Sequence, residues 1–150
     1  MNSSISFLIS AALVGNLCAS VFMTGIIFFI QIVQYPLLHN ISTFDFSCYF
    51  KKSNYRISWI VYSALVIEIG FAIGLSFLPV RAVMQVPILI TYMLLAAATL
   101  NTFLIQAPMT QRLQLAFDRE LLSKVMFFNG VRLVTWTLRT ILLCWIILFL

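Results

Sequence analysis

Residues 57–78 read ISWIVYSALVIEIGFAIGLSFL, a nearly unbroken apolar stretch whose only charged residue is Glu68. At a rise of about 1.5 Å per residue, an α-helix of this length covers about 33 Å. The hydrocarbon core of a bilayer is about 30 Å thick, so the stretch is long enough to cross it. Its length and composition predict a transmembrane helix with one carboxyl group near its middle.

Three further apolar stretches occupy most of the remaining chain. They cover residues 5–33, 86–106 and 125–149. Of the 150 residues, 63% are hydrophobic and 9% are charged, whereas a soluble domain carries roughly 45–50% apolar and about 25% charged residues. We therefore expect residues 1–150 to form a single transmembrane domain. The predicted fold class is all-α, an integral membrane four-helix transmembrane bundle with short interfacial helices.

Several kinds of chemistry are excluded by residues that the sequence lacks. There is no glycine-rich phosphate-binding loop. Cys18, Cys48 and Cys144 are far apart and form no C-x-x-C pair, which argues against thiol–disulfide exchange. His39 is the single histidine, so one chain cannot supply two histidines to a haem or build a histidine-rich metal site. The sequence identifies no metal site and no cofactor.

The connectors between the apolar stretches predict the orientation of the bundle. Six basic residues lie in the first and third connectors, and they are Lys51, Lys52, Arg56, Arg112, Arg119 and Lys124. The second connector, on the opposite side, carries only Arg81. Because basic loops are retained on the cytoplasmic side, we expect both termini to face away from the cytoplasm. The net charge of +5 is therefore explained by membrane topology, and we expect no nucleic acid partner.

Both basic connectors also contain apolar side chains at helical spacing. These are Phe46, Tyr49 and Phe50 in the first connector, and Leu113, Phe117 and Leu121 in the third. Short amphipathic helices of this kind lie in the headgroup region, where apolar side chains enter the lipid and basic ones attract anionic headgroups. We expect two interfacial anchors that contact membrane lipids. A docking surface for a partner protein is the alternative.

The buried charges suggest an ion pair between the second and fourth helices. Glu68 lies 11 positions after Ile57, and an unpaired carboxylate at that depth costs about 2.5–3.5 kcal/mol or more. Counted from Val125, Arg132 lies about 10 Å and Arg139 about 21 Å deep, whereas Glu68 lies about 16 Å in from the same side. We expect Glu68 to pair with these arginines if the two helices are neighbours.

A polar stripe on the fourth helix marks a candidate binding site. The stripe consists of Asn129, Arg132, Trp136 and Arg139. Their offsets of 0, 3, 7 and 10 place them on one helical face. The face must point into the bundle, because lipid does not accept two guanidinium groups. Further polar side chains lie at similar depth: Gln31 and Gln34 on the first helix, and Asn101, Thr102 and Gln106 on the third. The candidate ligand-binding residues are Glu68, Asn101, Asn129, Arg132, Trp136, Arg139, Gln31 and Gln34. A purely structural ion-pair network is the alternative interpretation.

Small residues indicate where helices approach closely. Gly70 and Gly74 form a G-x-x-x-G motif on the second helix, which allows close packing within the bundle or between chains. We expect packing within the bundle. Asn16, on the first helix, is also expected to occupy a packing position.

Two segments resemble a known group of proteins. Residues 31–37, QIVQYPL, resemble a Q-x-V-x-Y-P-L signature, and residues 129–139, NGVRLVTWTLR, resemble N-W-x-R-T-x-x-W-T-x-R. Both occur in a broad group of uncharacterised bacterial four-helix inner-membrane proteins, distantly similar to the four-helix family that contains anthrone oxygenase. The chain departs from the pattern at Gln34, where histidine is expected, and at Gly130 and Leu133. The resemblance implies a bacterial inner membrane, a buried arginine stripe and, by analogy, a quinone-like ligand.

Two principal hypotheses follow for the function. In the first, the protein binds a lipid-soluble or anionic, quinone-like ligand. Arg132 and Arg139 would hold its polar end, Glu68 would orient them, and Trp136 would pack against its ring or chain. In the second, the chain is an accessory subunit packed against a larger membrane complex or forms a homo-oligomer. A proton or ion pathway through Glu68 is a third possibility, which the apolar outer half of the bundle supports weakly.

Overall fold

The computed structural model describes residues 3–38 and 41–149, and in this part of the chain every regular element is helical. Three elements follow one another without a break in the first rod: α1 (Ser3–Phe29), the π-helical segment η1 (Ile30–Gln34) and α2 (Tyr35–Leu38). The second rod is α3 (Thr43–Ser76). The third consists of α4 (Ala82–Leu100), the π-helical segment η2 (Asn101–Gln106) and α5 (Ala107–Leu115). The fourth is α6 (Arg119–Leu148).

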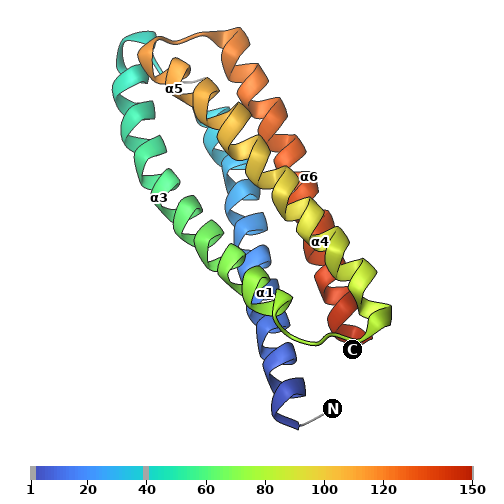
Figure 1. The fold of residues 1–150 in the computed structure, drawn as a ribbon. Coiled ribbons are helices and arrows are strands. Elements are labelled where there is room, and N and C mark those ends of the chain that lie inside the picture. Colours follow the sequence, from blue (N-terminus) through green and yellow to red (C-terminus); the bar gives the residue numbers. More distant parts are fainter. Residues whose placement is uncertain (1–2, 39–40, 150) are drawn as a thin grey trace.

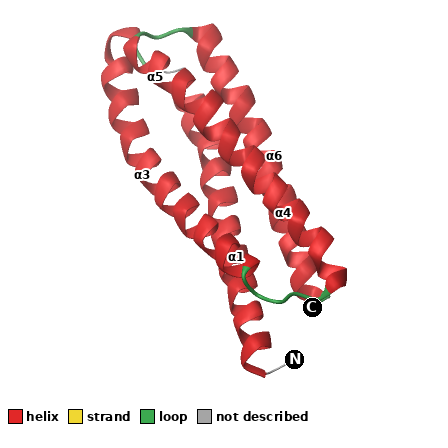
Figure 2. Ribbon diagram, in the orientation of Figure 1, coloured by secondary structure: helices red, strands yellow, loops and turns green. Residues whose placement is uncertain are grey.

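The four rods run side by side as an elongated bundle (Figure 1). Short loops join them at the two ends only (Figure 2). Among the described residues, four helices are long and apolar enough to cross a membrane. The chain therefore has the architecture of an integral membrane protein, as the sequence predicts. Both chain termini lie at the end opposite the two basic connectors (Figure 1).

The packing of the rods is uneven around the bundle. α1 packs closely against both α3 and α6, and α4 packs against α6. α3 contacts the third rod mainly through α5, near the connector end. Along its second half, α3 is joined to α4 by Tyr92, whose hydroxyl donates to the Ala72 carbonyl at 3.0 Å, and two cavities lined in part by Tyr92 open toward the outside of the bundle. The side between α3 and α4 is therefore the least tightly closed.

The helices extend beyond the predicted apolar stretches at the connector end. α3 begins at Thr43 rather than near residue 57, and α6 begins at Arg119 rather than near residue 125. Side chains cap both starts: the Ser42 hydroxyl accepts from the Asp45 N–H, and the Asp118 carboxylate accepts from two N–H groups of the first turn. Hydropathy marks the part of a helix that can lie in lipid, whereas capping decides where the helix itself begins.

The basic connectors are helical, as predicted, but they continue the long rods and do not form separate short helices. The first connector belongs to α3, and most of the third belongs to α5 and α6. Phe46 and Phe50 are fully buried and stacked at 5.4 Å, and Phe117 meets the Phe46 ring edge-on at 4.7 Å. Leu113 is also fully buried, whereas Tyr49 is half exposed. Most of these apolar side chains pack against one another as a protein core, because the rods stay together at this end.

The small-residue motif does not serve packing within the bundle, contrary to expectation. A methyl group added at Gly70 or Gly74 would meet no atom within 4 Å. At Gly15 of α1, by contrast, an added Cβ would fall 2.5 Å from the Phe71 ring of α3. This glycine therefore leaves room for an aromatic side chain of the neighbouring rod.

Candidate functional site

A buried ion pair ties all four rods together near the middle of the bundle. Arg139 of α6 forms an ion pair and hydrogen bond through Nη1 with Glu68 of α3, and both side chains are fully buried. Its Nη2 donates to Asn16 Oδ1 of α1 at 2.6 Å, and its Nε donates to the carbonyl oxygen of Thr91 in α4 at 3.2 Å. One guanidinium group therefore has a partner on each of the other three rods.

Trp136 completes this cluster from the Glu68 side. Its indole N–H donates to both carboxylate oxygens of Glu68, at 3.0 and 3.2 Å. The Trp136 side chain is fully buried. A buried ion pair is tolerated when further hydrogen bonds satisfy the remaining donors and acceptors. We call Asn16, Glu68, Thr91, Trp136 and Arg139 the closed network, because its two charges neutralise each other. Asn16 Nδ2 is buried there without a hydrogen-bond partner.

The predicted pairing between the second and fourth helices is confirmed, with Arg139 as the partner. Two parts of the network are new. Asn16, expected as a packing residue, accepts a hydrogen bond from Arg139, and the acceptor from α4 is a backbone carbonyl. A backbone acceptor has no signature in the sequence. The closed network also separates two apolar core clusters, one toward the connectors and one toward the termini.

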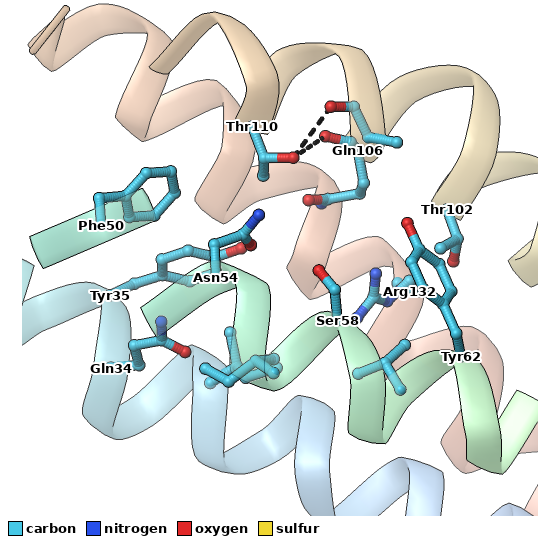
Figure 3. Close-up of a pocket in the computed structure, with 14 residues that line it drawn as sticks. Gln34, Tyr35, Phe50, Asn54, Ser58, Tyr62, Thr102, Gln106, Thr110 and Arg132 are labelled. Carbon is cyan, nitrogen blue, oxygen red and sulfur yellow. Dashed lines mark hydrogen bonds between the residues drawn. The ribbon is translucent and has the colours of Figure 1, made fainter. Parts of the chain in front are cut away.

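Arg132 lies two helical turns from Arg139 on α6 and has a very different environment. It is buried, with 6% of its surface exposed. Within the described part of the chain it makes no hydrogen bond or ion pair, and its buried Nε has no partner. Figure 3 shows its guanidinium facing a small cavity between the rods.

No side-chain carboxylate neutralises Arg132. The sequence contains four acidic residues. Each is engaged elsewhere: Asp45 with Ser42, Glu68 with Arg139, Asp118 with the first turn of α6, and Glu120 with Lys124 at 2.6 Å. None of them lines the cavity. Arg132 is therefore a buried cation whose counter-charge the acidic side chains of the chain do not supply.

The cavity beside Arg132, which we call the Arg132 chamber, is small and polar. Its volume is about 50 Å³, several times the ~10–15 Å³ that one water molecule requires. Three rods besides α6 line it, with Gln34 and Tyr35 from the first, Asn54, Ser58 and Tyr62 from α3, and Thr102, Gln106 and Thr110 from the third (Figure 3). The chamber has room for a group of the size of a carboxylate or phosphate, but not for a complete ring system.

Two π-helical segments border the chamber from opposite rods. In η1 the Tyr35 N–H bonds to the Ile30 carbonyl, and in η2 the Ala107 N–H bonds to the Thr102 carbonyl, each five residues back. Ile30, Gln34, Thr102 and Gln106 of these segments line the chamber. π-Helical turns inside α-helices occur frequently at functional sites.

The sequence did contain a signal for these segments. A proline follows each of them, in Gln34-Tyr35-Pro36 and in Gln106-Ala107-Pro108. A proline inside a helix removes one N–H donor and crowds the carbonyl four residues earlier. The predicted apolar stretches end at residues 33 and 106, just before these prolines. The rods instead continue through them as α2 and α5.

The remaining predicted residues mostly hold neighbouring rods together. Asn129 Nδ2 donates to Gln31 Oε1 at 2.8 Å, which joins α6 to η1. Asn101 Nδ2 donates to the Phe128 carbonyl at 3.3 Å. Gln34 lines the chamber and donates to Ser53 Oγ at 3.1 Å, while its own oxygen has no partner. Of the eight predicted ligand-binding residues, Arg132 and Gln34 line the chamber.

The polar face that α3 presents to the chamber is not among the residues predicted from the sequence. Asn54, Ser58 and Tyr62 follow one another at intervals of four residues and form one helical stripe. The spacing was visible, but residues near 54 were assigned to a connector. Tyr35 was also missed, because tyrosines are common near membrane interfaces without any special role.

A wider groove adjoins the chamber at the connector end. It has a volume of about 570 Å³ and shares Asn54, Ser58, Tyr62 and Thr110 with the chamber. Its outer wall carries Lys51 and Lys52 of α3, and Cys48 also lines it. We call this the basic groove. Together with Arg132 it forms a continuous, positively charged path into the bundle.

Metal binding finds no support in the part of the chain that the structure describes. No group of three or more histidine, cysteine, aspartate or glutamate side chains there is placed to hold a metal ion. His39 lies outside the described residues.

Comparison with protein-family models, with curated proteins and with solved structures gave no match for this chain. The class of the protein therefore rests on its own architecture, an all-α bundle of four helices that are long and apolar enough to span a membrane. The particular feature of this bundle is a buried arginine without a counter-charge.

Proposed function

We propose that this chain is a membrane protein that binds the anionic or oxygen-rich head of a lipid-soluble ligand at Arg132. The observation that supports this most strongly is the lack of any carboxylate partner for a buried guanidinium that faces a cavity. A guanidinium group forms strong, paired hydrogen bonds with carboxylate and phosphate oxygens. Leaving a buried charge unpaired is costly, and a bound anion removes that cost.

The surroundings of Arg132 suit such a ligand. The hydroxyl groups of Tyr35 and Ser58 line the chamber and can orient the oxygens of a head group (Figure 3). Thr102 and Gln106 also line it, but they already donate to the carbonyl oxygens of Ala98 and Val125. The phenolate of a quinone-derived compound, a carboxylate and a phosphate share the required chemistry. Because the chamber is small, it fits only the polar head, and the rest of the molecule must lie outside it.

Three of the residues that the sequence predicts to bind a ligand are not part of the proposed site. Glu68, Trp136 and Arg139 satisfy one another in the closed network, and we assign them a structural role. For the location we propose a bacterial inner membrane, with both termini on the periplasmic side and the basic connectors in the cytoplasm. Lys51 and Lys52 would then lie where anionic headgroups are found.

Native mass spectrometry of the protein, released gently from its own membrane, tests this function. We expect an adduct of defined mass on the wild-type chain and on Arg112→Leu, a control at an exposed arginine. The adduct should disappear in Arg132→Leu. Recovery only in a larger assembly with other polypeptides, without an Arg132-dependent adduct, would contradict the proposal and favour an accessory subunit.

A further inference from the structure

A second, apolar cavity lies on the open side of the bundle, farther from the connectors than the chamber. It has a volume of about 420 Å³ and lies between α3 and α4. Its walls are mainly aliphatic, with Ile69, Ala72 and Ile73 from α3 and Leu95, Ala96 and Leu100 from α4. We call it the α3–α4 seam. It faces outward, where a membrane would place hydrocarbon chains.

The chamber and the seam follow one another along α3 and the third rod. On α3, Tyr62 is the last residue that lines the chamber and Ile69 the first that lines the seam, two turns later. On the third rod, Thr102 borders the chamber and Leu100 borders the seam. The two cavities share no lining residue, so a molecule with its head in the chamber would reach the seam along the outside of the bundle.

One aromatic pair stands where the two sections meet. Tyr62 of α3 and Phe103 of η2 stack with their ring centroids 5.6 Å apart and an angle of 4° between the ring planes. Both side chains are partly exposed on the outside of the bundle. A hydrocarbon chain that leaves the chamber for the seam must pass beside this pair.

The depth of Arg132 also fits the head of a membrane lipid. Arg132 is 16 residues from Leu148 at the terminal end of α6, which corresponds to about 24 Å. In a hydrocarbon core about 30 Å thick that begins at Leu148, Arg132 lies in the third nearest the connectors. Arg139 lies about 14 Å from Leu148, close to the centre. The seam lies on the central side of the chamber, as the acyl chain of a lipid does relative to its headgroup.

The charges around this path favour one class of lipid. Arg132 and the adjoining Lys51 and Lys52 are positive, and no acidic side chain lines the chamber or the basic groove. A zwitterionic headgroup would bring its cationic part into this positive region, whereas an anionic headgroup complements it.

We infer that the ligand of the chamber is an anionic lipid from the leaflet on the connector side, with its head beside Arg132 and one hydrocarbon chain in the α3–α4 seam. This inference rests on the proposed function. The seam contributes little affinity, because the chain leaves an equally apolar bilayer. Its role is to orient the lipid, and the charged head decides which lipid binds.

A photoreactive lipid tests this arrangement directly. The protein is placed in nanodiscs of phosphatidylcholine that contain a small fraction of phosphatidylglycerol with a diazirine on one acyl chain. After irradiation, labelled peptides are located by mass spectrometry. We expect labels on seam residues such as Ala96, about tenfold above those from phosphatidylcholine with the same diazirine chain, the difference expected for one charge-assisted hydrogen-bonded contact.

Three variants connect the label to the proposed geometry. Ala96→Trp fills the seam from its outer side and should remove the seam label. Ala97→Trp is the matched control, because Ala97 is exposed but does not line the seam. It should leave the label unchanged. Arg132→Leu should reduce labelling by the anionic probe to the level of the zwitterionic one.

Different experimental results would overturn the lipid inference and the proposed function. Labels spread evenly over outward residues such as Phe22 and Val66, together with an intact Arg132-dependent adduct, would overturn the lipid inference and leave the proposed function standing. Equal seam labelling in wild type and in Arg132→Leu would overturn the inference, since the head would not then determine binding. If the adduct also persists in Arg132→Leu, the proposed function fails as well.

Discussion

Arg132 and Arg139 lie on the same face of α6, two turns apart, and both are buried, yet their surroundings are opposite. Arg139 has partners on three other rods, including the carboxylate of Glu68. Arg132 has no hydrogen-bond partner among the described residues and faces a cavity. The role of a buried cation depends on which groups neutralise it. Arg139 is neutralised within the protein and stabilises the fold, whereas Arg132 requires a counter-charge from a bound molecule.

The largest effect is expected when the closed network is broken on one side. Arg139→Leu leaves the buried Glu68 without its counter-charge, which should cost about 3–5 kcal/mol of stability. Thermal unfolding in mild detergent measures this loss. The double variant Glu68→Leu/Arg139→Leu removes both charges and should recover most of it. A double variant as unstable as the single one would show that the ion pair is not the source of the effect.

A smaller loss is expected when one hydrogen bond of the same network is removed. Trp136→Phe keeps a buried aromatic ring but deletes the N–H that serves both Glu68 oxygens. Hydrogen bonds to charged groups contribute about 1.5–3 kcal/mol, so the unfolding transition should shift accordingly. Trp145→Phe is the matched control, because Trp145 is exposed outside the network, and it should change little.

The helical geometry of the chamber provides a third, more modest test. Pro108→Ala restores an N–H donor just after η2 and removes the crowding of the Leu104 carbonyl. We expect η2 to relax toward an α-helix, with a change in stability of less than about 1 kcal/mol. The register of Thr102 and Gln106 would shift, so adduct occupancy should fall. Full occupancy with unchanged stability would contradict the link between η2 and binding.

The smallest effect on stability is expected at Arg132. Arg132→Leu removes a buried charge without stranding a partner, so the unfolding transition should stay within about 1 kcal/mol of wild type or rise. The same unfolding assay as for Arg139→Leu checks this. A loss as large as that of Arg139→Leu would show that Arg132 has a structural partner after all.

The sequence predicted the class of fold and the ion pair because both depend on simple quantities. Apolar length gives the four spans, and depth brings Glu68 level with the arginines of α6. Depth alone did not distinguish Arg132 from Arg139, since Glu68 lies between them. That choice depends on the rotation and neighbours of each helix. α1 packs between α3 and α6, so Glu68 and Arg139 meet across the interior of the bundle.

The chamber was harder to predict because tertiary packing creates it. Its walls combine residues from four rods, and two of its borders are π-helical segments that hydropathy does not detect. The connector end was misread for a related reason. Phe46 and Phe50 have the spacing of an interfacial helix, but continued helix packing buries them in protein. Composition does not show whether an apolar side chain is surrounded by lipid or by protein.

The most direct test of the account compares ligand occupancy in two variants by native mass spectrometry. Arg132→Leu should fold normally and lose the adduct. Glu68→Leu/Arg139→Leu, which removes the other buried arginine together with its counter-charge, should keep the adduct at close to wild-type occupancy. The opposite pattern, with the adduct retained in Arg132→Leu and lost in the double variant, would contradict the division between a closed structural network and an open binding site.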